Sequence, residues 1–204
     1  MILACLTTMA NAEDSRTPIE IVTQTATSVA EQVANEREQL ESNPDKLFTL
    51  VDHVFLPVFD TRYAGRLILG RHGRTATAEQ RKQFVDAFYQ FLVQSYASNM
   101  LKFRKDRIQV FPAPAGQPNN PKRTVVRTQM SLDDGSAASV DYSLRLTPAG
   151  WRIFDVRIEG ISYVQTYRKQ FDAEISARGL DATITRLQAE ASPQDMAPAD
   201  SSTP

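Results

Sequence analysis

Cysteine, histidine and long apolar runs are scarce in this chain of 204 residues, and each scarcity excludes a kind of site. Cys5 is the only cysteine, so an internal disulfide and a thiolate metal centre are both excluded. The only histidines, His53 and His72, lie in neither an H-x-x-x-H nor an H-x-x-E-H spacing, so carboxylates would have to complete any metal site. No G-x-S-x-G motif presents a serine nucleophile.

An excess of charge of one sign is also lacking. The 23 basic and 24 acidic residues give a net charge of −1, so no overall field draws the protein to nucleic acid or to an anionic membrane. After residue 12, no apolar run approaches the roughly 20 residues that cross a bilayer. The mature chain is therefore expected to be soluble, and any attraction to an anionic partner must be local.

The first twelve residues, MILACLTTMANA, are uncharged and largely apolar. Ala10-Asn11-Ala12 has the small-x-small pattern that precedes signal-peptidase cleavage, so we expect a cut after Ala12. The charged segment that normally opens a signal peptide is missing, and residues 1–12 are interpreted as a truncated one. A disordered N-terminus is the alternative. Cleavage would remove Cys5, which suits an oxidising periplasm.

Apolar residues at helical spacing predict six helices. Thr17-Pro18 opens the first, Asn43-Pro44 the second, and a capping box from Thr77 to Gln80 the fourth. A break is expected just before Pro57. The predicted helices span residues 17–42, 44–58, 60–69, 77–101, 164–179 and 180–187.

After Phe103 the apolar pattern takes the period of strands, over residues 107–111, 124–130, 138–146 and 151–158. Asp134-Gly135 and Pro148-Ala149-Gly150 are turn signals, whereas the proline-rich residues 112–121 form a longer loop. Val140 and Leu144 alternate with polar residues, which indicates one buried and one wet face. We expect an α+β fold in which helices pack on one side of a four-stranded antiparallel sheet.

This fold is predicted to be a single domain over residues 13–190. Residues 191–204 contain little that a core could bury and are predicted to be disordered.

Residues 63–74, YAGRLILGRHGR, approach the spacing of a phosphate-binding P-loop. A helix precedes the glycines, however, and Arg71-His72 stands where a lysine and a hydroxyl are required. Gly70 is better explained as the end of a helix with cations near its negative pole. The four arginines form either a surface for a phosphate headgroup or an acidic partner, or a solvated face: Arg62, Arg66, Arg71 and Arg74.

Asp155 is the one acid embedded in an apolar strand. It is either a general base with a raised pKa, as in a small cavity enzyme, or a cap or ion-pair partner within the sheet. The fourth predicted helix is apolar on several faces, so helices and sheet either fill a solid core or leave a dry cavity that accepts hydrocarbon. Composition alone does not separate these alternatives.

Four segments resemble, in sequence and in order, the MlaC family, also called the toluene-tolerance auxiliary family. They read NPDKLFTLVDHVFLPVFDTRYAGRLILG, TATAEQRKQFVDAFYQFLVQSYA, WRIFDVRIEGISYVQTYRKQF and ARGLDATITRL. The resemblance covers about residues 19–190. Its most specific pieces are Tyr63-Ala64 with Leu69-Gly70, the helix start at residues 77–84, and Asp155-Val156 with residues 159–162.

The resemblance implies a nuclear transport factor-like, cystatin-like fold, in which helices wrap the concave face of a twisted sheet. It also implies a periplasmic phospholipid carrier without catalytic activity or cofactor, acting as a monomer that binds no nucleic acid. Such a carrier holds acyl chains in an apolar pocket and takes lipid between two complexes, maintaining the lipid asymmetry of the outer membrane. One is an outer-membrane lipoprotein–porin complex, and the other is an inner-membrane ABC transporter with an MCE-domain protein.

Strand alternation and helix arcs nominate the apolar side chains that would line such a pocket. They are Phe84, Phe88, Leu92, Tyr96, Met130, Val140, Tyr142, Leu144, Val156, Ile158, Ile161 and Val164. The competing interpretations are a small cavity enzyme with Asp155 as its base, and a scaffold protein with no cavity.

Overall fold

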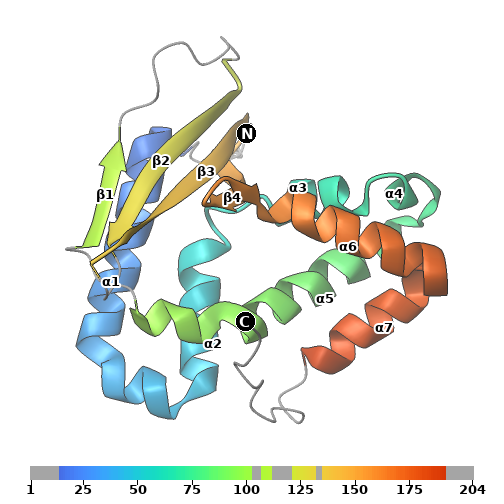
Figure 1. Ribbon diagram of the computed structural model, residues 1–204, viewed down its shortest axis with the longest axis horizontal. Helices are drawn as coiled ribbons and strands as arrows, with labels where there is room; N and C mark the ends of the chain where they lie inside the picture. The colour runs from blue at the N-terminus through green and yellow to red at the C-terminus, as the bar shows by residue number, and fades with distance from the viewer. Residues whose placement is uncertain (1–13, 103–106, 112–120, 132–134, 192–204) are drawn as a thin grey trace, which may run out of the picture.

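Helices and a sheet segregate into two regions of this computed structural model, which describes residues 14–102, 107–111, 121–131 and 135–191. Figure 1 shows α3, α5, α6 and α7 gathered on one side and the sheet with α1 on the other. The predicted signal peptide and most of the predicted tail and proline-rich loop lie outside the described residues.

Three helices begin where the capping signals predict, and Ser162 caps a fourth for which no cap was predicted. Thr17 and Thr77 each form a full capping box, Asn43 accepts a hydrogen bond from the Lys46 N–H, and Ser162 accepts one from the Gln165 N–H. The helices are α1 (Pro18–Ser42), α2 (Pro44–Phe55), α3 (Thr61–Leu69), α4 (His72–Thr75), α5 (Ala78–Tyr96), α6 (Tyr163–Arg178) and α7 (Leu180–Glu190).

Two helical details differ from the sequence-based expectation. A single-turn helix, α4, occupies a stretch expected to be a loop, and α5 ends at Tyr96 instead of near Leu101. The chain continues from α5 as a 3-10 helix, η1 (Ala97–Lys102). The break expected before Pro57 is present, because α2 ends at Phe55.

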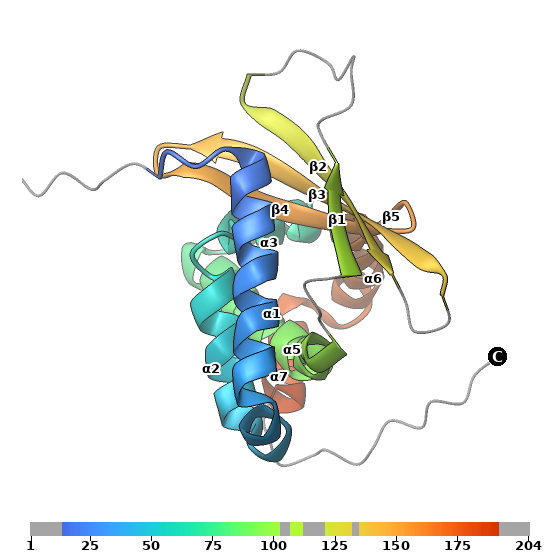
Figure 2. The ribbon, with the colours of Figure 1, turned by 90° about the vertical axis from the view of Figure 1, so that its left-hand side faces the viewer.

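The sheet is antiparallel throughout, with strand order β1-β2-β3-β4-β5. Its strands are β1 (Ile108–Phe111), β2 (Arg123–Ser131), β3 (Ala137–Thr147), β4 (Gly150–Ile158) and β5 (Ile161–Ser162). The α+β class is confirmed, and the two-residue β5 adds a fifth strand to the four expected. Figure 2 shows the helices lying on one side of the sheet.

The chain before α3 extends the edge of the sheet. The Ile153 N–H donates to the Val58 carbonyl (2.8 Å), and the Asp60 N–H donates to the Ile153 carbonyl (2.7 Å), so β4 is flanked there by a short parallel bridge. The β3–β4 register shifts between Ser143 and Leu144 at this place. Because α3 starts at Thr61, the bridge fixes the start of α3 against the sheet.

Buried apolar side chains of the described residues fall into three clusters. The helix cluster joins α3, α5, α6 and α7 through Ile68, Leu69, Phe84, Ala87, Phe88, Tyr167, Phe171, Ile175, Ile184 and Leu187. The sheet cluster joins α1 to the sheet through Ile21, Val22, Val58, Val126, Leu144 and Ile153. The α1–α2 cluster consists of Val29, Val33, Leu40, Leu47, Leu50, Val51, Val54, Val93 and Ala97.

Candidate functional site

The nominated lining residues divide between two of these clusters. Phe84 and Phe88 are buried in the helix cluster, and Leu92 and Val164 pack against it. Leu144 is fully buried in the sheet cluster, where the directly paired Tyr142 and Val156 pack against it.

Two more nominated residues, Val140 and Met130, lie on the same face of the sheet as Tyr142 by register, buried and half-buried respectively. The two sets thus lie in separate layers, one of helices and one of strands.

Three nominated residues are exposed to solvent. Tyr96 ends α5 with 39% of its surface exposed, Ile158 ends β4 with 37%, and Ile161 begins β5 with 63%. Large apolar side chains seldom stay this exposed without a ligand or partner when they gather in one region. They mark the ends of the elements that carry the buried lining residues.

Aromatic rings interlock within the helix cluster. The Phe84 and Phe171 rings meet edge to face at 5.1 Å, and the Phe88 and Tyr167 rings do so at 4.8 Å. The Tyr96 and Tyr167 hydroxyls share a hydrogen bond of 3.1 Å, and the Tyr163 ring lies 6.2 Å from both rings. Tyr163 and Tyr167 were not nominated, although Tyr167 lies on the apolar track of residues 164–175.

The tyrosine hydroxyls of this region are shielded from water. Burial raises the pKa of Tyr142 to about 12, and a hydrogen bond with Thr128 partly opposes the rise. Burial, and then the hydrogen bond with Tyr96, raise the pKa of Tyr167 well above its usual range. Both side chains therefore present neutral hydroxyls at physiological pH.

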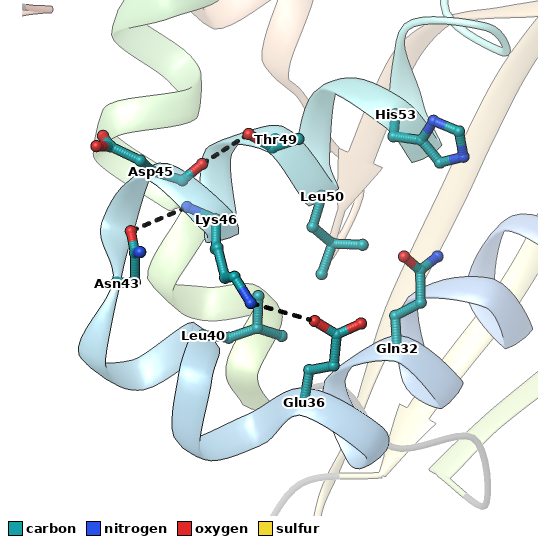
Figure 3. Close-up of a pocket in the computed structure, with 9 residues that line it drawn as sticks. All are labelled: Gln32, Glu36, Leu40, Asn43, Asp45, Lys46, Thr49, Leu50 and His53. Carbon is teal, nitrogen blue, oxygen red and sulfur yellow. Dashed lines mark hydrogen bonds and ion pairs between the residues drawn. The ribbon is translucent and has the colours of Figure 1, made fainter.

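A surface pocket of about 380 Å³ lies between α1 and α2. Figure 3 shows that Glu36 and Gln32 of α1 face Lys46, Thr49 and His53 of α2 across it. Asp60, Arg62, Arg145 and Arg152 are among the residues that line a second pocket, of about 360 Å³, at the start of α3. Neither pocket is lined by any of the twelve nominated residues, so their role as lining stays a prediction.

Comparison with known proteins decides the family. The family model described as MlaC protein matches residues 23–189. The chain belongs to the MlaC family.

Two known proteins are similar to this chain over most of its length. The toluene tolerance protein ttg2D of Pseudomonas putida is 28% identical over 83% of this chain and 79% of its own length. The intermembrane phospholipid transport system binding protein MlaC of Haemophilus influenzae is 26% identical over 86% of this chain and 82% of its own.

A solved structure shares the fold. The phospholipid-binding protein of Ralstonia solanacearum, in complex with a phospholipid, superposes with a TM-score of 0.76 at 26% identity. The match covers 86% of this chain and 97% of that chain.

Asp155 is held by hydrogen bonds at the start of α6. One carboxylate oxygen accepts a hydrogen bond from the Ser162 hydroxyl (2.7 Å), and the other accepts one from the Val164 N–H (3.0 Å). The side chain is buried, with Arg157 3.7 Å away. Asp155 therefore joins β4 to the start of α6, which matches the capping interpretation.

The four arginines of the α3 region have different neighbours, and their role as a headgroup or partner surface stays a prediction. Arg71 pairs with Asp172 (2.8 Å) and donates to the Ser176 hydroxyl (3.1 Å), while the Arg66 guanidinium lies 4.9 Å from the centre of the Tyr63 ring. Arg62 and Arg74 are exposed and make no ion pair with any other described side chain.

The glycine of the near P-loop ends a helix, as expected. Gly70 has a φ of 51°, and its N–H donates to the Arg66 carbonyl (3.2 Å) at the end of α3.

Over the described ranges, no group of three or more His, Cys, Asp or Glu side chains is arranged to hold a metal ion. None of the helices described has both the length and the apolar character needed to cross a bilayer.

Proposed function

We propose that this protein is a phospholipid carrier that encloses acyl chains between its helix cluster and its sheet cluster. The observation that carries the proposal is the family match together with a superposable relative that holds a phospholipid. Because the match spans nearly all of that relative, the shared fold supports assigning the same class of ligand, a phospholipid, to this protein.

The chamber is proposed between the faces that carry the nominated residues. Leu92 and Val164 stand at the border of the helix cluster, and Tyr142 and Val156 at the border of the sheet cluster. An acyl chain bound between them would leave the apolar interior of a membrane for apolar side chains of the protein. Each methylene kept from water contributes about 0.8 kcal/mol to binding. The lining therefore has to be apolar over the whole length of the acyl chain.

The two clusters share no buried residue, and lipid binding is proposed to move them apart. Lipid shifts the protein toward the separated state only because it binds that state more tightly than the unseparated one. This shift can occur without altering the secondary structure. Tyr96, Ile158 and Ile161 are exposed at the ends of the layers, where a chain would pass first.

The central experiment is lipid extraction from protein purified from its native host, with identification by mass spectrometry. We expect close to one phospholipid per protein. Protein that carries no lipid from the host and takes none up from vesicles would remove the main support for this function.

The site is tested with two matched isoleucines. Ile158→Asp introduces a charge at the proposed mouth of the chamber and should lower lipid occupancy severalfold, since a desolvated carboxylate opposes acyl chains. Ile19→Asp is the control, because Ile19 is similarly exposed (39%) but lies in the first turn of α1, a few residues after Asp14, which bridges to Gly150. Those residues flank the opposite end of β4 from Ile158. Equal occupancy in the two variants would argue against this position of the mouth.

The protein is proposed to have no catalytic role. Asp155 was the candidate base, and its two oxygens are engaged by Ser162 and Val164. Asp155→Asn should therefore keep lipid occupancy and transfer, while losing about 1–3 kcal/mol of stability through weaker hydrogen bonds. Chemical denaturation and a vesicle transfer assay measure the two effects. Loss of transfer in a folded Asp155→Asn protein would support the enzyme alternative.

The remaining parts of the proposal concern the domain boundaries, the cellular location and the protein partners. We infer a single lipid-binding unit over residues 13–190, working in the periplasm between an inner-membrane ABC transporter complex and an outer-membrane lipoprotein–porin complex. The name of the Haemophilus influenzae relative supports a role in a transport system. Fractionation of host cells and purification with each membrane complex are the direct tests.

A further inference from the structure

Three arginines lie side by side across the sheet, on the face opposite the sheet cluster. Arg123 of β2 is paired directly with Arg145 of β3, and Arg145 is paired directly with Arg152 of β4. Like charges directly opposite each other destabilise a sheet. The row therefore needs negative charge around it.

The protein supplies only part of that charge. Arg145 pairs with Asp60, and Arg152 lies 3.2 Å from Asp14. Asp14 is shared with Arg16, whose hydrogen bonds hold the pKa of Asp14 at about 2. Among the described residues, two carboxylates thus form the ion pairs of these guanidinium groups.

Tyr63 holds part of the row in position. The Arg145 guanidinium lies 4.4 Å from the centre of the Tyr63 ring, and Arg123 donates to the Tyr63 hydroxyl while lying 5.7 Å from the same ring. The Tyr63 ring in turn meets Phe154 edge to face at 5.2 Å. Stacked guanidinium groups lose little further freedom when they bind an anion.

The row opens into the second surface pocket. Arg145 and Arg152 line it together with Arg62, Asp60, Thr61 and Thr147. Arg62 is exposed and makes no ion pair among the described side chains. The pocket of about 360 Å³ thus has three guanidinium groups against one lining carboxylate, in a protein whose net charge is −1.

We propose that the pocket formed by Arg62, Arg145 and Arg152 at the start of α3 is a binding site for a phosphate group. A phosphate matches the planar fork of arginine, and it supplies the negative charge that the arginine row lacks. The site shares no residue with the proposed acyl-chain chamber, so it is independent of that function.

The test uses inorganic phosphate, titrated into the full chain by calorimetry or NMR at constant ionic strength. Arg62→Gln removes the unpaired cation and should weaken binding about three- to fivefold. Asp60→Asn should act oppositely, strengthening binding by about the same factor, because it removes the competing carboxylate. Asparagine also caps helices well, so the start of α3 is kept.

Arg37→Gln is the control, since it removes the same charge from an exposed helix pair on α1. Opposite changes in the two pocket variants, with none in the control, support the site; a loss of fold cannot strengthen binding. Equal weakening by Arg37→Gln, or no opposite change with Asp60→Asn, overturns it.

A second experiment distinguishes the source of the phosphate. Binding of the same variants to phosphatidylcholine vesicles that contain or lack phosphatidic acid is measured by co-flotation. Retention on phosphatidic acid vesicles with the same variant order assigns the site to lipid headgroups, and binding of inorganic phosphate alone assigns it to free phosphate. Absence of binding in both experiments overturns the proposal.

Discussion

Tyr142 combines an aromatic ring in the sheet layer with a hydroxyl that is kept from water. It packs against the sheet cluster, directly opposite Val156. Its burial raises the pKa to about 12, so the neutral form is favoured in the folded state. The titration of Tyr142 therefore reports how apolar the proposed chamber wall is.

The pH dependence of stability follows from that shift. Between the unfolded pKa of about 10 and the folded pKa of about 12, the unfolded chain releases a proton that the folded chain keeps, so stability falls as pH rises. At pH 11 the loss from Tyr142 is about 1 kcal/mol, and below pH 9 it is absent. Tyr142→Phe should remove this part of the loss in urea unfolding at pH 8 and pH 11. An equal loss in both proteins would mean that Tyr142 is well solvated.

The burial of single residues could be predicted from the sequence more readily than the residues that they contact. Leu144 and Phe84 are fully buried, as strand alternation and helix arcs indicate. Ile158 and Ile161 were expected to face inward, yet they are exposed because their strands end there. The pairing of Tyr96 with Tyr167 joins residues far apart in sequence, which no local period specifies.

At the scale of elements, α3 and α5 cross at a glycine. Gly65 is buried, and a Cβ added to it would overlap the Val85 Cγ2 atom. The close crossing brings the helix that follows the sheet edge onto the helix that carries Phe84 and Phe88. Gly65 thereby sets the distance between the sheet edge and the helix cluster.

Gly65→Ala should destabilise the protein by about 1–3 kcal/mol, because the crossing has no room for a methyl group. In a Val85→Ala background the clash is gone, and the same change should be neutral or stabilising by up to about 1 kcal/mol, since alanine favours helix. Chemical denaturation of the four proteins in this cycle gives the coupling. Simple additivity would show that α3 and α5 are not in contact at this point.

Elements with strong periods and caps were predicted well, and elements without them were not. The capping boxes at Thr17 and Thr77 and the alternation of β3 are local signals. The two-residue β5 has no period of its own and exists because the free edge of β4 accepts it. The bridge of Val58 and Asp60 to Ile153 likewise depends on tertiary contact.

For the whole molecule, the decisive property is that the core is divided. The helix cluster holds α3, α5, α6 and α7 together, while the sheet cluster holds α1 to the strands. Each unit can keep its own packing when the contact between them is replaced by lipid. The family resemblance pointed to such a chamber, whereas composition could not separate it from a solid core, because both bury the same residue types.

Lipid should therefore stabilise the whole molecule through mass action. Phospholipid at about 100 times its dissociation constant adds about 2.7 kcal/mol to the folded state, which corresponds to a rise of about 5–10 °C in Tm for a chain of this size. Delipidated protein is heated with and without phospholipid and followed by calorimetry. Glycerophosphocholine, which has the headgroup without acyl chains, is the control and should raise Tm much less than phospholipid does. An equal rise with both compounds would place the stabilising contacts at the headgroup, against a chamber between the two clusters.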